Sequence, residues 1–432
     1  MLRFFLLIFL LLSSISFLFC QEQSHWLPIN KDFKIQAFLS AQLWSSYTFD
    51  QLVFEEESQT YNAVDNRFNF LIRRARIGFR AEAYDHLKFY VAGAYDLIGR
   101  DVLSGLRGGT NNGSLPNVGI WDAFIQWKIN PSSDAFHLTA GYFRPQLSRE
   151  SITSGWSVNS MEKSFSQNYI RRHLTGIGPG RAAGINLGGL LLNDNQDFGI
   201  NYNIGIFTPS YLSNSGNSGG TVSSPLFVAR SVFFLGEPEM QDYKLGYNIN
   251  YFNQRKGLSI GMSGSWQGET ELFSSSYTAQ LDFLLNLGPL NLDGDWNFMW
   301  RRSLPNEIIT LSEKLSASNT GHLRIGYNII LQQKIFLEPT FMLMQFNGAI
   351  NDLPRALAQN VGHFSGKDYT YDIGINWYLN KNRLKLMLHY IIHDGNLGSA
   401  PDGSAINQFF SQGNVGAIQR GDWLGLGMNF IL

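Results

Sequence analysis

The chain has 432 residues, and its 33 lysines and arginines nearly balance its 34 aspartates and glutamates, for a formal charge of −1. This balance excludes a typical nucleic-acid binder, which needs a basic excess to displace counterions. The single cysteine excludes a disulfide framework and a cysteine-based zinc site. Aromatic residues make up 14% of the chain and charged residues only 16%, with 43 glycines, a composition that favours a β protein in contact with lipid.

The first twenty residues follow the pattern of a secretory signal peptide. Arg3 gives a basic start, residues 4–12 form an uninterrupted apolar run, and serines then lead to Cys20. Cleavage after Cys20 is favoured over lipidation of that cysteine, because a lipoprotein site needs a small preceding residue and Phe19 is large. We therefore predict a signal peptide over residues 1–20.

From residue 33 onward, apolar and polar residues alternate in segment after segment, which is the side-chain period of a β-strand. The clearest segments, in chain order, are 33–43, 243–251, 258–266, 292–300, 369–377 and 424–432. They approach the roughly ten residues that a tilted strand needs to cross an outer membrane, whereas soluble strands average about 5–6 residues. Trp44, Trp127 and Trp423 lie near segment ends, where their rings would sit among lipid headgroups. This pattern favours membrane-spanning strands over a soluble sandwich.

The polar faces of these segments are too polar for a dry protein core. Asn291, Asp293, Asp295 and Asn297 share one face of a single segment. Burying such groups without partners costs on the order of 2–7 kcal/mol each, and a water-filled lumen removes that cost. The sequence therefore predicts an all-β fold, a transmembrane antiparallel β-barrel whose apolar faces meet outer-membrane lipid. We expect this outer-membrane barrel over residues 33–432, preceded by a short periplasmic segment over 21–32.

Short and long connectors alternate along the chain, as in bacterial barrels with short periplasmic turns and long outer loops. Seven turns are predicted at 85–86, 130–134, 193–196, 253–257, 287–289, 332–334 and 380–382. Eight outer loops are predicted at 50–67, 98–119, 145–181, 208–241, 267–276, 302–320, 346–368 and 394–419. The count gives sixteen strands with both chain ends on the periplasmic side. The apolar segment 227–235 is expected in the fourth loop, because adding it alone breaks the alternation; a barrel of 18 strands is the alternative.

Several segments resemble the phosphate-selective porin O and P family of Gram-negative outer membranes. The resemblance is carried by RRARIGFRAEAYDHLKFYVAGAYD at 73–96, WDAFIQWKINPSSDAFHLTAGYFRPQLSRES at 121–151, GRAAGINLGG at 180–189, NYNIGIFTP at 201–209 and DIGINWYLNKNRLKLML at 372–388. It implies an outer-membrane pore that passes small hydrophilic solutes and assembles as a homotrimer. The ladder of lysines and arginines expected of a dedicated phosphate channel is not obvious in the sequence.

The basic residues on the predicted inward faces are nearly balanced by acidic ones, so the strand walls alone do not support strong ion selectivity. Two groups stand out. Three arginines share one face of the second predicted strand, and the connector 145–181, with the arginine before it, carries six basic residues against Glu150 and Glu162. Sixteen-stranded porins fold a loop inward at this place, and a narrow basic passage favours anions. The candidate residues for anion preference are Arg74, Arg76, Arg80, Arg144, Arg149, Lys163, Arg171, Arg172 and Arg181.

Structural pairing is the alternative role for these cations, with Glu82, Glu150 and Glu162 as partners. The eight histidines are scattered, and His389 and His393 would lie about 13 Å apart on a strand, so neither a metal site nor a cofactor is expected. The sequence has no nucleophile elbow or phosphate-binding loop, so we do not expect an enzyme. We predict a passive outer-membrane channel for small hydrophilic solutes with a mild, phosphate-like anion preference. A non-conducting adhesin or structural barrel is the alternative function.

Overall fold

The computed structural model describes residues 26–107, 119–213, 217–305, 315–394, 407–412 and 415–432. Within these ranges, sixteen long antiparallel strands close into one barrel, because β2 pairs with both β5 and β24. The strands are β2 (Phe33–Thr48), β5 (Arg67–Ala83), β6 (Leu87–Ile98), β7 (Gly119–Lys128), β8 (His137–Phe143), β9 (Ala182–Leu192), β10 (Phe198–Thr208), β13 (Leu226–Gly236), β14 (Lys256–Gln267), β15 (Ser275–Leu287), β16 (Leu290–Arg302), β17 (Leu315–Tyr327), β19 (Ile335–Asn347), β20 (Lys367–Asn380), β21 (Leu384–Asp394) and β24 (Trp423–Ile431).

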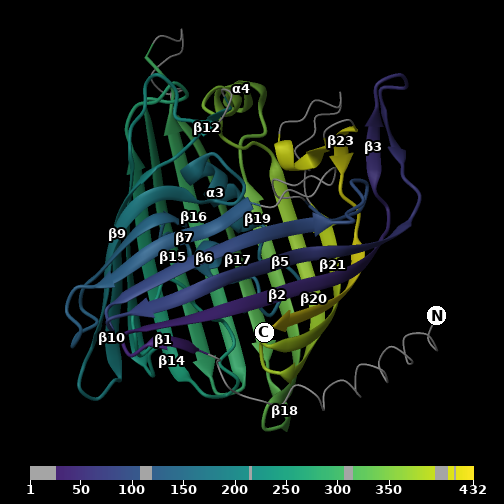
Figure 1. Ribbon diagram of the computed structural model, residues 1–432. Coiled ribbons are helices and arrows are strands. Elements are labelled where there is room, and N and C mark those ends of the chain that lie inside the picture. Colours follow the sequence, from purple (N-terminus) through teal and green to yellow (C-terminus); the bar gives the residue numbers. More distant parts are fainter. Residues whose placement is uncertain (1–25, 108–118, 214–216, 306–314, 395–406, 413–414) are drawn as a thin grey trace.

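Short elements complete the sheet and cover one end of the barrel (Figure 1). The short strands β1 (Leu27–Asn30) and β18 (Ile329–Gln332) pair with β2 and β19 at the end where β24 finishes. At the opposite end lie α4 (Asp352–Asn360) and a small sheet of β3 (Leu52–Glu55), β4 (Thr60–Ala63), β22 (Ser411–Gln412) and β23 (Gly416–Gln419). We call these the turn end and the loop end. The predicted signal peptide lies outside the described residues, and no described helix is long and apolar enough to cross a membrane.

Alternation along the strands separates an apolar outside from a polar inside. Ile77 and Phe79 on β5 point outward and are more than half exposed, at 62% and 52%. The inward side chains of β16, among them Asn291 and Asp293, are at most 3% exposed. An apolar belt against lipid and hydrogen-bonded polar groups inside are what a closed membrane barrel requires. The predicted fold, a barrel of sixteen antiparallel strands, is confirmed.

The position of one strand was predicted wrongly. Residues 227–235, which were expected in the fourth outer loop, belong to β13, and residues 243–251, which were expected to form a strand, do not. The outer loop is therefore 209–225, and the connector at the turn end is 237–255 instead of 253–257. Val232 and Phe234 of β13 face inward and are fully buried, so this part of the strand is apolar on both faces and lacks the alternation of its neighbours. Arg230 is the charged residue on the same inner face, and it pairs with Asp282.

The inward apolar face of β13 is covered by the connector itself. Tyr243 and Tyr247 pack with Val232 and Phe234 in one buried cluster. Residues 237–255, which we call the inner segment, thus leave the turn end and fold into the barrel. One side of the inner segment packs on the wall, and the other faces polar groups of the lumen. Aromatic and polar residues therefore alternate along it, and in the sequence this alternation resembles that of a strand.

Candidate functional site

Residues 144–181, which we call the long loop, connect β8 and β9 and contact inward side chains of the barrel wall. The loop contains α2 (Arg149–Ile152) and α3 (Ser166–Thr175). Glu162 pairs with Arg73 at 2.6 Å and also with Arg74 of β5. The Tyr169 hydroxyl donates to Asp368 of β20 at 3.0 Å. Ion pairs and hydrogen bonds to strands on different sides of the barrel hold this loop across the lumen.

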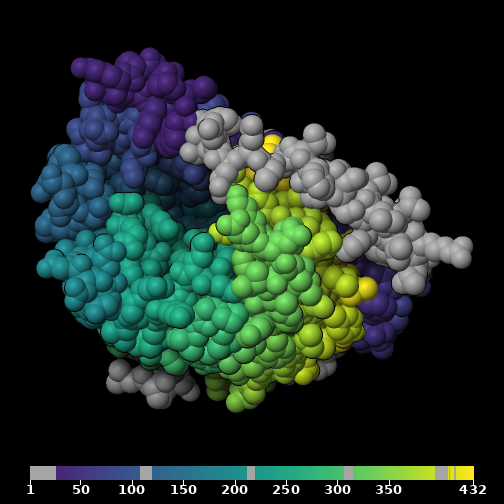
Figure 2. All heavy atoms as spheres, turned by 90° about the horizontal axis from the view of Figure 1, so that it is seen from below, coloured from purple at the N-terminus to yellow at the C-terminus, as the bar shows by residue number. Residues whose placement is uncertain are grey.

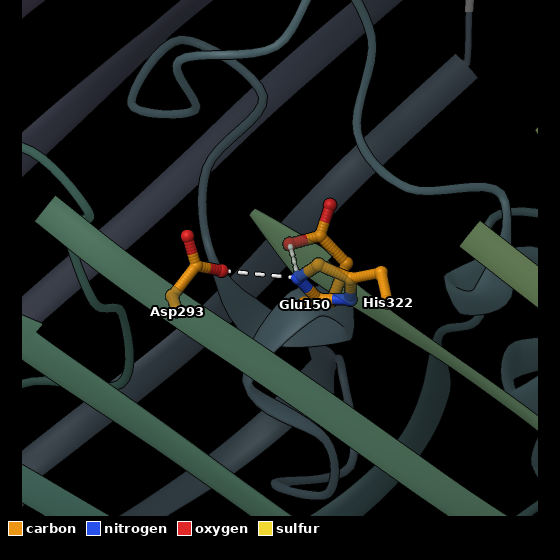
Figure 3. Close-up of side chains that lie close together, drawn as sticks. All are labelled: Glu150, Asp293 and His322. Carbon is orange, nitrogen blue, oxygen red and sulfur yellow. Dashed lines mark hydrogen bonds and ion pairs between the residues drawn. The ribbon is translucent and has the colours of Figure 1, made fainter. Parts of the chain in front are cut away.

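A second group of charges anchors α2 (Figure 3). His322 Nε2 lies 3.0 Å from Asp293 Oδ2 and 3.7 Å from Glu150 Oε2, as the dashed lines mark. Donor atoms of these three residues lie within 4.8 Å of one another, so among the described residues they could hold a metal ion. Arg324 already supplies a cation, with Nη2 2.9 Å from Glu150 Oε2. Burial alone would raise the pKa of Glu150, but the charges of Arg324 and His322 have the larger effect and lower this pKa to about 2. The group acts as an anchor for α2.

The inner segment meets the long loop in the middle of the lumen. Glu239 accepts from both terminal nitrogens of Arg149, at 2.7 and 2.8 Å, and Arg149 Nε donates to Asp282 of β15 at 2.9 Å. All three side chains are fully buried. Further along, Asn250 donates to Asn328 at 2.8 Å and to Glu338 at 3.1 Å. The two segments together fill the part of the lumen bounded by β10 to β20.

Breaking this junction is expected to be costly. In Glu239→Gln the buried guanidinium of Arg149 loses a charged partner, which costs about 3–5 kcal/mol for a buried pair. The exposed pair of Lys34 and Glu82 offers a control, since it is 46% and 28% exposed and Glu82→Gln is expected to cost about 0–1 kcal/mol. Thermal unfolding of both purified variants, followed by circular dichroism, measures the difference. Equal losses would contradict a junction at Arg149.

A cavity of about 1160 Å³ remains on the other side of the lumen, along β2 and β5 to β8. Figure 2, seen from below, shows a hollow between the purple and blue residues of these strands and the teal residues. Eleven lysines and arginines line the cavity against three carboxylates, Glu82, Asp96 and Asp122. The cavity is therefore strongly basic, although the inward charges predicted along the strands as a whole are nearly balanced.

Seven of the nine predicted residues line this cavity, namely Arg74, Arg76, Arg80, Arg144, Lys163, Arg171 and Arg181. Arg149 does not, because it is buried against Glu239 and Asp282. Arg172 does not line it either, and its guanidinium lies 5.6 Å from the centre of the Phe409 ring. Sequence reasoning missed Arg73, which lines the cavity because a register shift between β2 and β5 turns two successive arginines inward.

The seven residues differ in their partners. Arg181 holds Asp122 through two bonds of 3.0 and 3.1 Å, and Arg76 pairs with Asp96. Arg144, Lys163 and Arg171, which we call the cation trio, instead converge on the backbone of α2 and its C-cap. Their groups donate to the Ser151 carbonyl at 2.8, 3.2 and 2.5 Å. Across the part of the chain that the structure describes, none of the ion pairs to carboxylates includes them.

Burial and crowding make the charged state of the cation trio costly. Burial lowers the pKa of Lys163 well below its usual range, and the neighbouring charges of Arg171 and Arg144 lower it further. Burial and nearby arginines also lower the pKa of Arg171 and of Arg144. Carbonyl oxygens at the C-terminus of a helix carry only partial negative charge. A mobile anion in the cavity would therefore stabilise the trio.

The attachment of the long loop is expected to be insensitive to moderate acid. Burial raises the pKa of Glu162, but Arg73 and Arg74 outweigh burial and lower it to about 2. A carboxylate with a lowered pKa contributes stability that is present above its unfolded pKa of about 4.3 and is lost as the pH falls toward 2. Single-channel conductance in planar bilayers is thus expected to stay constant from neutral pH to about pH 4. Glu162→Gln should show at neutral pH the loosened state that the parent reaches only near pH 2; a parent transition near the ordinary carboxyl pKa would contradict the pairing.

Comparison with known proteins agrees with this geometry. Residues 50–224 match the family model for phosphate-selective porin O and P. This match confirms the resemblance. Outside residues 50–224 the chain is similar to known proteins in fold, and no curated protein is significantly similar to it in sequence.

Solved porin barrels superimpose on nearly the whole chain. Pseudomonas putida OprB gives a TM-score of 0.55 at 10% identity, with 92% of this chain and 94% of that chain covered. Salmonella typhi OmpF, in complex with daunomycin, gives a TM-score of 0.53 at 12% identity, with 94% of this chain and 100% of that chain covered. An anion-selective porin from Comamonas acidovorans gives a TM-score of 0.52 at 11% identity, with 93% of this chain and 100% of that chain covered. Identities this low show the shared fold. Together with the family match and the apolar belt, this shared fold places the chain in a bacterial outer membrane.

Proposed function

We propose that the protein is a passive outer-membrane channel for small hydrophilic solutes and that it passes anions in preference to cations. The observation that carries the proposal is the lining of the cavity, with eleven basic residues against three acidic ones. Within a narrow, low-dielectric passage, charges of one sign focus the field and raise the local concentration of counterions. The cation trio adds positive charge that no carboxylate of the described residues pairs with.

A diffusion channel requires no reaction, and we assign none to this chain. Assembly as a homotrimer also remains a proposal, supported by the family match. The alternative is a non-conducting adhesin or structural barrel, in which the outer loops carry the function. A basic cavity beside the long loop favours the channel, because cations that line open space can act on solutes there, whereas an adhesin would bind its partner through its outer loops.

Reversal potential in a KCl gradient tests the proposal. The purified mature chain is inserted into planar bilayers, and the sign of the zero-current potential tells which ion passes more easily. We expect the potential to move toward the equilibrium potential of chloride. Absence of conductance would favour the adhesin, and a shift toward the potassium equilibrium potential would overturn the anion preference while leaving a pore.

A further inference from the structure

Three aromatic rings form a continuous stacked row on the inner wall of the cavity. Phe38 of β2 stacks on Tyr90 of β6, with ring centres 5.5 Å apart and an interplanar angle of 18°. Tyr90 in turn stacks on Phe124 of β7 at 5.3 Å and 20°. All three rings are partly exposed and line the cavity. We call them the ring row.

The barrel backbone is arranged to hold these rings side by side. Tyr90 and Phe124 are directly paired across β6 and β7. Between Phe38 and Tyr90 runs β5, where the residue paired with Phe38 is Gly78. A Cβ atom at Gly78 would lie 2.6 Å from the Phe38 ring, so only glycine lets that ring reach across β5. The row therefore depends on a small residue at one defined place.

The ring row differs from the other inward rings nearby. Phe143 and Phe207 continue the line of aromatic contacts, at 5.8 and 5.3 Å, but are 2% and 1% exposed and lie in the cluster packed under the long loop. Those two rings have a packing role. The ring row exposes aromatic surface to the cavity, where a polar lining would be better solvated.

A cation stands directly over the row. The Arg80 guanidinium lies 5.1 Å from the ring centre of Phe38 and 5.7 Å from that of Tyr90. Arg80 is paired in register with Tyr90, is exposed, and takes part in none of the carboxylate ion pairs found among the described residues. Exposed aromatic surface and an unneutralised guanidinium thus lie within about 6 Å of each other.

We propose that this channel binds anions that carry a flat aromatic ring, of the class of aromatic monocarboxylates, with the ring on Tyr90 and Phe124 and the carboxylate on Arg80. The inference rests on the proposed anion channel and names its solute class. Ring stacking supplies affinity that a small aliphatic anion lacks, and Arg80 donates to a carboxylate in the planar geometry that guanidinium favours. A neutral sugar would use the rings and leave the charge of Arg80 unused.

The test measures block of the chloride current by three carboxylates added to the bilayer chamber. Benzoate carries a flat ring, cyclohexanecarboxylate has similar size and charge without a planar ring, and acetate has the charge alone. We expect benzoate to block with an apparent Kd about tenfold below those of the other two, which corresponds to about 1.4 kcal/mol of ring stacking. Equal block by all three, or equal block by maltose, would overturn the inference.

Variants separate the row from general packing. Tyr90→Leu with Phe124→Leu is expected to abolish the benzoate advantage, whereas Tyr90→Phe should keep it. Phe79→Leu removes a ring of the same hairpin that faces outward, 52% exposed, and should leave block unchanged. Arg80→Gln is expected to weaken all three carboxylates and to keep their order. If a leucine variant does not fold, the comparison of the three carboxylates on the parent protein still decides.

The two proposals fail in different ways. The KCl reversal potential, measured before any carboxylate is added, decides whether the channel prefers anions. A chloride-preferring channel that does not distinguish benzoate from cyclohexanecarboxylate contradicts the ring row alone. A channel without chloride preference contradicts the proposed function itself.

Discussion

Replacing residues 237–256 by an Asn-Gly turn is expected to raise single-channel conductance severalfold and to weaken ion selectivity. Gly236 and Gly257 are already paired across β13 and β14, so a two-residue hairpin loop can join these strands without changing their register. The inner segment then no longer fills the lumen beside β13, where Tyr243 and Tyr247 are 2% exposed. Removing it merges the filled half of the lumen with the existing cavity.

The deletion has a defined cost and a matched control. Val232 and Phe234 lose their cover, and Arg149 keeps only Asp282 as a partner, so we expect lower thermal stability along with higher conductance. Removing residues 56–59, the exposed tip between β3 and β4, shortens a connector outside the lumen and should leave conductance unchanged. Unchanged conductance in the inner-segment deletion would show that this segment does not obstruct the path of ions.

The second large effect is expected from the cation trio. Arg144→Gln, Lys163→Gln and Arg171→Gln combined should lower the chloride-to-potassium permeability ratio about tenfold, because focused charge raises local anion concentration by that order. The reason is that these three side chains lie on the cavity with backbone carbonyls as partners, so their charge is not cancelled locally. Reversal potentials in a KCl gradient give the ratio directly.

A control for the trio removes the same charge elsewhere. Lys31, Lys256 and Arg302 are exposed and do not line the cavity. Their combined replacement by glutamine changes net charge equally and is expected to leave the permeability ratio within experimental error. If both triple variants lowered the permeability ratio equally, net charge would account for the selectivity, and the position of the cation trio in the cavity would not matter.

Much of the barrel could be predicted from the sequence, because a strand between lipid and a polar lumen must alternate apolar and polar residues, and this alternation is visible in the sequence. Segment 292–300 is an example, since β16 carries buried polar groups on one face and apolar groups on the other. The same rule failed at β13, whose inner face is apolar because the inner segment covers it. A strand that packs on both faces has no alternation to detect.

The basic lining of the cavity could also be predicted in part from the sequence. Basic residues of the long loop could be found from their number, but the burial of Arg149 depends on Glu239, in a segment that sequence reasoning had taken for a strand. The ring row had one weak signal, an aromatic residue at 38 among the polar residues of its face. Which rings stack could not be read, because stacking depends on strand register and on the space at Gly78.

The hollow beside β2 to β8 has a consequence for how such a channel diversifies. Apart from Tyr243, Lys244, Leu245, Gly246, Arg383, Ile431 and Leu432, every residue of its wall comes from positions 26–181. If the chain is the channel proposed above, substitutions in that first part can alter which solutes pass, while the remaining strands keep the cylinder closed. Most of the cavity lining and the strands that close the cylinder on its far side therefore lie in different stretches of the chain.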